Sequence, residues 1–443
     1  MSEGENLFEP HPVLRTLRTE DPLKWVKQRL DKVVVGEDNN KIVLFLSKLT
    51  YLMDEPTHEV LKGPSGVGKS YLGERVLEAF PNGDVIKVSR VTEAFLDRCK
   101  NLKHKIFFVH QLGGAESAQN SLHVMLSERG LQLGTVKRGK EGEWESYFVE
   151  TEGPISFCST TTTLNLDPQL ETRCFHLYSD MSEEQPRRIQ QSQQKWDETP
   201  WLKQKAEEGI KEIKEMVEFI KKSGVKRVVV PFSRLITLPS KNLRIRRDRP
   251  KLMALVKSLA MLRQWQRFVI EVEGERYVLA EWQDFTDIAK VADEVLTLTL
   301  QELGPYERKL LRACWVPFGA KGEWFNAKQA SSAAKAEGLD LNQRTARRYL
   351  NRLVNKGYVF LEQEGRGRGM TNMYSINEEA FKKTRKTVFA GLTVLPKQEL
   401  RKALKAWVTE NIRNGRVEVY KYDDEGRLTT YGYIKDGKLA KAL

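Results

Sequence analysis

The sequence has few cysteines, no long apolar run and a shortage of acidic residues. Its 443 residues include 4 cysteines, and no two of them form a C-x-x-C pair, so neither a disulfide framework nor a zinc site is predicted. No apolar stretch approaches the roughly 18 residues that a membrane helix needs. The first residues are acidic and do not resemble a signal peptide. We therefore expect a cytoplasmic protein with no membrane partner.

The shortage of acidic residues leaves the chain strongly basic. Lysine and arginine number 73 against 60 aspartates and glutamates, which gives a net charge of +13. Such an excess favours a polyanionic partner, with nucleic acid as the leading candidate, although charge alone supports only nonspecific attraction. A hydrophobic content of 40% excludes a disordered chain.

One motif organises the rest of the sequence. It reads G-x-x-x-x-G-K-S without a mismatch over Gly63, Pro64, Ser65, Gly66, Val67, Gly68, Lys69 and Ser70. In this motif the glycines let backbone N–H groups wrap phosphates, the lysine reaches the β and γ oxygens, and the serine hydroxyl ligates Mg²⁺. An apolar pair precedes the motif and a helical apolar pattern follows it, which is the expected strand, loop and helix context. The motif predicts that ATP and Mg²⁺ bind here, with Ser70 as the metal ligand.

A second buried strand ends in an unusual pair of residues. Residues 105–109 form a continuous apolar run of the kind found in parallel sheets. In P-loop NTPases such a strand normally ends in two acids, one supporting Mg²⁺ and one polarising the attacking water. Here the strand ends in His110 and Gln111. Gln111 in the position of a glutamate predicts ATP binding with slow hydrolysis, unless Glu116 or Glu128 supplies the acid instead.

The next segment alternates in the manner of a β-hairpin. Two alternating strands, residues 131–136 and 144–149, flank a basic tip that contains Lys137, Arg138 and Lys140. A further buried strand, residues 154–158, ends in hydroxyl side chains at residues 159–163. At the carboxyl end of a strand, such hydroxyls are well placed to contact a γ-phosphate or water.

The order of these motifs resembles the AAA+ ATPase superfamily. Within it the sequence looks like the minichromosome maintenance (MCM) branch, and more closely like the helicase modules of primase-helicases from phages and mobile elements. The resemblance covers roughly residues 30–300 and includes Asp167 to Arg173 and Arg244 to Leu259. Two departures stand out, since His110 and Gln111 replace the acidic pair and the chain starts shortly before the ATPase core.

The resemblance implies roles for particular residues. Thr161, within the hydroxyl run, corresponds to the first sensor, and Arg173 looks like the arginine finger presented to a neighbouring subunit. Arg246 and Arg247 are equally good candidates for the sensor-2 arginine of the helical lid. The hairpin residues Lys137, Arg138 and Lys140 would grip the DNA backbone inside a ring, for which a hexamer is expected.

A second domain is predicted from three helices and a hairpin. Residues 306–316, 326–337 and 342–356 read as helices, followed by strands at 358–362 and 373–376. This is the order of a winged helix, whose third helix can enter a major groove. The exposed face of the third helix is expected to hold Arg344, Arg347, Arg348 and Arg352. The expected DNA-binding residues are Arg344, Arg347 and Arg348 on this helix, and Arg366 and Arg368 in the wing. A protein-interaction module is the alternative.

The predicted domain order follows directly. Residues 1–20 form an arm, 21–300 an α/β AAA+ core with a parallel sheet and helical lid, 301–381 an α+β winged-helix domain, and 382–443 a basic tail.

The predicted function is an ATP-dependent, ring-forming DNA helicase of a phage or mobile element, acting on single-stranded or forked DNA with a possible primase or loader partner. The alternative is an ATP-switched DNA-binding scaffold, such as a replication initiator, helicase loader or transposition regulator. A metabolic kinase is disfavoured because nothing in the sequence resembles a small-molecule pocket.

Overall fold

The structure is a computed structural model. It describes residues 12–96, 99, 102–112, 116–128, 130–138, 144–162, 167–182, 184–238, 245–301, 303–364, 370–384, 396–411, 417–435 and 438–441. The chain divides into a large unit, residues 1–292 with 391–443, and a small unit, residues 293–390. The division falls within helix α11 (Trp282–Gln301). Among the described residues, no helix is long and apolar enough to cross a membrane.

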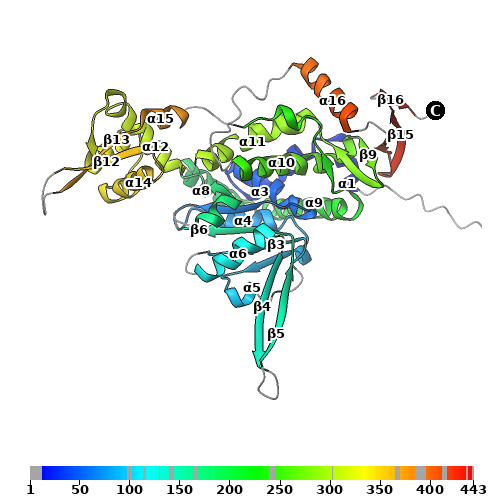
Figure 1. Cartoon of the computed structure of the whole chain (residues 1–443), viewed down its shortest axis with the longest axis horizontal. Helices are drawn as coiled ribbons and strands as arrows, with labels where there is room; N and C mark the ends of the chain where they lie inside the picture. Colours follow the sequence, from blue (N-terminus) through cyan, green and yellow to red (C-terminus); the bar gives the residue numbers. More distant parts are fainter. Residues whose placement is uncertain are drawn as a thin grey trace, which may run out of the picture. The chain divides into compact units, whose positions relative to one another are not determined.

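The centre of the large unit is a parallel sheet of five strands in the order β2-β3-β6-β1-β7 (Figure 1). Its strands are β1 (His58–Lys62), β2 (Val85–Val88), β3 (Lys105–Val109), β6 (Ile155–Thr161) and β7 (Cys174–Tyr178). The predicted strands before the P-loop, at 105–109 and at 154–158 are thus confirmed. Because all five strands run the same way, the segments that follow them meet at one edge, the carboxyl edge.

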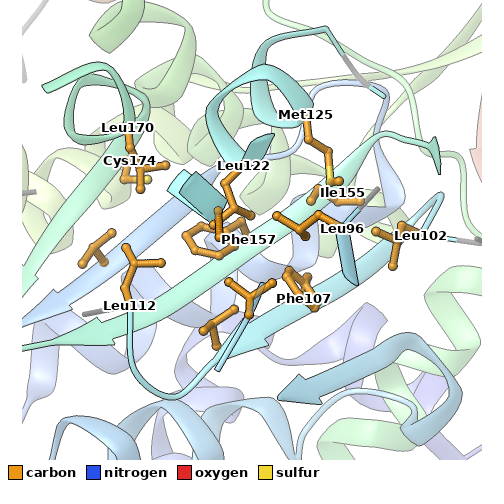
Figure 2. Close-up of a cluster of buried hydrophobic side chains, with 14 residues drawn as sticks. Leu96, Leu102, Phe107, Leu112, Leu122, Met125, Ile155, Phe157, Leu170 and Cys174 are labelled. Atoms are coloured by element: carbon orange, nitrogen blue, oxygen red, sulfur yellow. The ribbon is translucent and has the colours of Figure 1, made fainter. Parts of the chain in front are cut away.

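Helices cover both faces of this sheet. On one face, α4 (Lys69–Leu77) lies so close to β3 that a Cβ added to Gly73 would stand 3.0 Å from the Phe108 ring. On the other face, Phe107 and Phe157 join a buried apolar cluster with Leu122 of α6 (Glu116–Glu128) and Leu170 of α7 (Pro168–Arg173), as Figure 2 shows. Alternate residues of each strand therefore point to opposite cores, as in a three-layer α/β fold.

The remaining helices of the large unit surround this core. They are α1 (Pro12–Thr19), α2 (Pro22–Val33), α3 (Asp38–Leu49), α5 (Glu93–Leu96), α8 (Glu184–Glu198), α9 (Pro200–Ser223), α10 (Ile245–Leu262) and α11. Short 3-10 turns lie at Thr50–Leu52, Asn82–Asp84, Ser233–Leu235 and Gln264–Gln266. The helical segment formed by α8 and α9 is interrupted at Thr199, because Pro200 has no N–H to continue the first helix and starts a new one.

The first residues differ from the predicted arm. Residues 12–19 form helix α1, which buries Val13, Leu14 and Leu17. Two turns of helix are too short to show a convincing period in sequence, and packing against the rest of the unit stabilises them. Strand β8 (Val228–Val229) has only two residues.

A second sheet has six strands in the order β16-β15-β14-β9-β10-β8. It joins β9 (Val269–Val272) and β10 (Glu275–Leu279), which the sequence analysis did not identify, to β14 (Val417–Tyr422), β15 (Leu428–Lys435) and β16 (Lys438–Lys441). Strands β14 and β15 pair as an antiparallel hairpin. However, residues 417–441 belong to the large unit rather than to a separate tail, because β14 pairs with β9 and helix α16 (Lys397–Asn411) covers the sheet with Val408.

The predicted basic hairpin is also present. Strands β4 (Gly130–Arg138) and β5 (Trp144–Glu152) pair antiparallel along their full length, with Lys137 opposite Glu145 and Arg138 opposite Trp144. The two strands extend away from the parallel sheet (Figure 1). Lys140 lies outside the described residues.

The small unit contains the predicted three helices and hairpin. Helices α12 (Pro305–Trp315), α13 (Ala327–Ala336) and α14 (Gln343–Asn355) precede β12 (Val359–Glu364) and β13 (Thr371–Ile376). A short strand, β11 (Phe325–Asn326), and a 3-10 turn, Gly319–Lys321, lie between α12 and α13, and α15 (Glu378–Thr384) follows the hairpin. The order β11-β13-β12 and the buried face of α14 produce the α+β architecture predicted for this region.

Candidate nucleotide site and DNA-contacting surfaces

The P-loop connects the carboxyl end of β1 to helix α4. Gly66 and Gly68 adopt φ angles of +84° and +88°, in the left-handed region where side chains are disfavoured. No atom lies within 4 Å of a Cβ built on either glycine, so the loop is open on that side. Gly68 precedes α4 without a side-chain cap, which leaves the first helical N–H groups available to an anion. This cradle fits a triphosphate.

Lys69 and Ser70 occupy the first positions of α4. The Lys69 side chain curls back so that its Nζ donates to the carbonyl oxygen of Pro64 at 2.5 Å. Burial lowers the pKa of Lys69, because an ammonium loses water there. A phosphate oxygen would replace a neutral carbonyl with a charged acceptor and would restore the preference for the charged lysine. The hydroxyl oxygen of Ser70 would be the protein ligand of Mg²⁺.

Two of the predicted catalytic residues lie on adjacent strands at the carboxyl edge. Thr161 ends β6 and stands opposite Lys62, the last residue before the P-loop. Gln111 follows β3, where its amide N–H donates to the Ser89 carbonyl at 3.2 Å and its side chain is exposed. The side chains of the alternative acids, Glu116 and Glu128, lie outside the described part.

A carboxylate that the sequence analysis missed lies beside His110. Nδ1 of His110 stands 3.3 Å from Oε1 of Glu74, a residue one helical turn after Ser70 on α4. The two residues are far apart in sequence and belong to different motifs. Only the packing of α4 on β3 brings them together.

The predicted arginine finger lies at the opposite, amino edge of the sheet. Arg173 immediately precedes β7, where its Nε donates to Ser127 Oγ at 2.5 Å and its Nη1 donates to the Gln169 carbonyl at 2.6 Å. Arg247 of α10 donates to the neighbouring Thr172 hydroxyl. Burial, and then the positive charge of Arg247, lower the pKa of Arg173. Arg247 is thus brought beside the predicted finger. Both sensor-2 candidates, Arg246 and Arg247, are exposed.

The strand register sets the separation between these arginines and the P-loop of the same chain. β1 and β7 are parallel, with His58 opposite Cys174 and Lys62 opposite Tyr178. Arg173 precedes Cys174, whereas the P-loop follows Lys62. At about 3.3 Å per residue, the two edges are roughly 16 Å apart.

The turn between α2 and α3 reaches the P-loop side of the sheet. The Tyr71 hydroxyl of α4 donates to the Val33 carbonyl at 2.9 Å, and the Asn40 amide donates to the Tyr178 carbonyl at 2.7 Å. Gly36 has a φ of +65°, and a Cβ there would overlap the Gln185 amide.

The basic residues of the small unit separate into two groups. Arg344, Arg347 and Arg348 of α14 are exposed, on the side away from buried Leu350 and Leu353. Arg352 is not part of this exposed group, since its Nη1 lies 2.9 Å from buried Glu307. Arg366 and Arg368 lie outside the described residues.

The glycine cradle, the lysine at the start of α4 and the order of the parallel strands give the large unit a P-loop α/β fold of the AAA+-like type. More particularly, residues 9–223, just under half of the chain, match the MTBMA_p00010 P-loop domain. No curated protein sequence matches the chain.

Solved structures resemble the chain only weakly. A full-length MCM homolog from Methanopyrus kandleri is 13% identical with a TM-score of 0.42, over 65% of this chain and 62% of the homolog, less than two thirds of its length. The apo NrS-1 C-terminal region is 12% identical with a TM-score of 0.28, over 84% of this chain and 80% of that chain. The Aeropyrum pernix ORC1 protein in complex with DNA is 13% identical with a TM-score of 0.21, over 85% and 92% respectively. All three TM-scores lie below 0.5.

Proposed function

We propose that this protein is an ATP-dependent, ring-forming DNA helicase or translocase that serves replication of a phage or mobile element. Lys69 and Ser70 of one subunit hold the phosphates and Mg²⁺ of ATP. Arg173 and Arg247 of the next subunit complete the site. Nucleotide turnover moves the β4–β5 hairpins along DNA, with Lys137, Arg138 and Lys140 holding phosphates rather than bases. A hexamer is the expected ring.

One observation carries the ring proposal. Arg173 and the P-loop of the same chain lie on opposite edges of one sheet. An arginine can stabilise the transferring phosphoryl group only when it touches it, so Arg173 is suited to the ATP of another copy. A contact that joins the carboxyl edge of one copy to the amino edge of the next is heterologous, and such contacts generate rings when the rotation closes.

The DNA part of the proposal rests on charge and on exposed arginines. The net charge of +13 favours a polyanion. Arg344, Arg347 and Arg348 present donors on one exposed helical face, in the position from which a winged helix contacts DNA. Their chemistry suits phosphate contacts and predicts little base specificity.

The test compares ATP hydrolysis by the wild-type chain and Gln111→Glu, with and without single-stranded DNA. We expect the Glu variant to turn over ATP faster than wild type, because it places a carboxylate where the attacking water is polarised. We also expect DNA to stimulate both proteins, and ATP-dependent unwinding of a forked duplex by the variant. An absence of DNA stimulation and of unwinding in both proteins would contradict the helicase proposal.

A second candidate is an ATP-switched scaffold that binds DNA without translocating, such as an initiator, helicase loader or transposition regulator. The residues His110 and Gln111 favour it, because a site without the usual acidic pair would hold ATP for longer. Under this alternative, ATP promotes assembly on DNA in both proteins, whereas neither the wild-type chain nor Gln111→Glu unwinds a fork.

A further inference from the structure

The carboxyl end of β3 holds a histidine and a carboxylate side by side where two acids normally stand. His110 follows the strand directly, and its Nδ1 lies 3.3 Å from Oε1 of Glu74. Both side chains are partly exposed, at 31% and 40%, so water can reach them. Glu74 and Ser70 are four residues apart on α4 and therefore lie on the same face of the helix.

His110 is fixed from several sides. Its amide donates to the Val88 carbonyl of β2 at 2.9 Å, and its carbonyl accepts a hydrogen bond from the Thr160 hydroxyl of β6. Its ring packs edge-on against Phe108, with the centroids 4.7 Å apart. The ring of Phe108 also packs closely against Gly73 of α4. The contacts that hold α4 on β3 therefore also set the position of the imidazole relative to Glu74.

We propose that Glu74 and His110 together replace the missing acid of this strand as the base for ATP hydrolysis, an inference that rests on the proposed ATPase function. Glu74 lies beside Nδ1 and favours the imidazole form that carries its proton there, which leaves Nε2 as the proton acceptor. The attacking water gives a proton to Nε2 while its oxygen bonds to the γ-phosphorus. The bond from that phosphorus to the β,γ-bridging oxygen breaks, ADP leaves, and the imidazolium later returns its proton to solvent. His110 acts on the water directly, and Glu74 is a positioning residue.

The experiment measures the rate constant for turnover (kcat) and the Kd of a fluorescent ATP analogue for four proteins, namely wild type, His110→Asn, Glu74→Gln and the double variant. We expect His110→Asn to lower kcat by about 100-fold or more, which is the usual contribution of a general base. Glu74→Gln should lower it by about tenfold or more, and the double variant should be no slower than His110→Asn, because the two residues act as a unit. The Kd should stay within about twofold in every case, since neither residue holds the phosphates.

Glu78→Gln is the matched control, because it removes the same charge at the end of the same helix, where Glu78 pairs with Arg75 instead of His110. A second readout does not depend on turnover. The chain has 6 histidines, so ¹⁵N-histidine NMR can resolve His110, and its Nδ1 signal should shift in Glu74→Gln but not in Glu78→Gln.

The outcomes separate this inference from the proposed function. Full ATP turnover by His110→Asn would overturn the proposed role of Glu74 and His110 and leave the ATPase proposal standing. The same conclusion would follow if the wild type bound ATP normally without hydrolysing it while Gln111→Glu was active. Failure of all these proteins to bind the ATP analogue would overturn both.

Discussion

Burial controls the charge of a single acid in the strand that carries the P-loop. Glu59 of β1 is completely buried and forms an ion pair with Lys48 of α3, which is also completely buried. Lys48 Nζ donates in addition to Ser156 Oγ at 2.8 Å and to the Phe157 carbonyl at 2.7 Å. Burial raises the pKa of Glu59 to about 7, although the charge of Lys48 opposes the shift. The strand beneath the nucleotide site therefore contains a carboxyl group that titrates near neutral pH.

This shift predicts how stability depends on pH. The folded-state pKa of Glu59 lies above its ordinary value of 4.5, so the folded protein binds more protons between these two values. The stabilisation is complete below about pH 4.5 and is lost as the pH rises through about 7. We expect the free energy of unfolding of wild type to fall between pH 5 and pH 8 relative to that of Glu59→Gln, as measured by urea unfolding.

The contributions of other titrating groups to the pH dependence cancel in that comparison. Glu271→Gln provides the control, because Glu271 is only partly buried and pairs with Arg276 at the surface. Parallel pH profiles for wild type and Glu59→Gln would show that burial does not perturb this carboxyl.

At the scale of the element, helix α14 has two different kinds of arginine. Glu307 of α12 is buried and forms ion pairs with Arg352 and Lys356, each at 2.9 Å. These two cations hold α12 and α14 together. Arg344 and Arg347 are exposed on the other side of the helix, so their removal costs little stability and can report on a partner.

We predict that replacing both Arg344 and Arg347 with alanine weakens binding to duplex DNA to a similar extent for all sequences. Contacts to phosphates carry no sequence information, and each one lost should reduce the slope of log K against log salt by about 0.9. Fluorescence anisotropy at several salt concentrations measures this slope. Lys309→Ala, which removes an exposed cation from α12, is the control. A sequence-selective loss of binding, or an unchanged slope, would argue against phosphate contacts by α14.

At the scale of the whole molecule, the parallel sheet separates the two halves of the proposed ATP site. Lys69 lies at the carboxyl edge and Arg173 at the amino edge of the same sheet. A single chain cannot bring these residues together without breaking the register between β1 and β7. Activity should therefore depend on assembly and should follow the combination of subunits in a ring.

Mixing two inactive variants tests this dependence. Lys69→Ala and Arg173→Ala should each lack ATPase activity in the Gln111→Glu background. In an equal mixture, about a quarter of the interfaces join an intact Lys69 to an intact Arg173, because contacts in a head-to-tail ring form independently. We expect the mixture to recover roughly that fraction of the activity. An inactive mixture whose subunits demonstrably exchange would show that Arg173 does not act on a neighbour's ATP.

Local patterns were sufficient to predict most of the parallel sheet. The P-loop spacing, the apolar strand at 105–109 and the hairpin at 130–152 depend on short-range periodicity and turn chemistry. Short or mixed elements were missed for the same reason. Helix α1 has only 8 residues, too few to show a clear helical period of apolar residues. Strands β9 and β10 include charged residues, so their apolar residues do not alternate clearly.

Residue identity at fixed spacing encodes the phosphate-binding loop, the strand that ends without acids and the positive net charge. The packing of the elements sets which residues meet. Glu74 reaches His110 because Gly73 lets α4 approach Phe108. Arg247 reaches Thr172 beside Arg173, and β14 pairs with β9 although Glu418 and its partner Glu271 are distant in sequence. Such contacts depend on the packing of whole elements, and no local pattern encodes them.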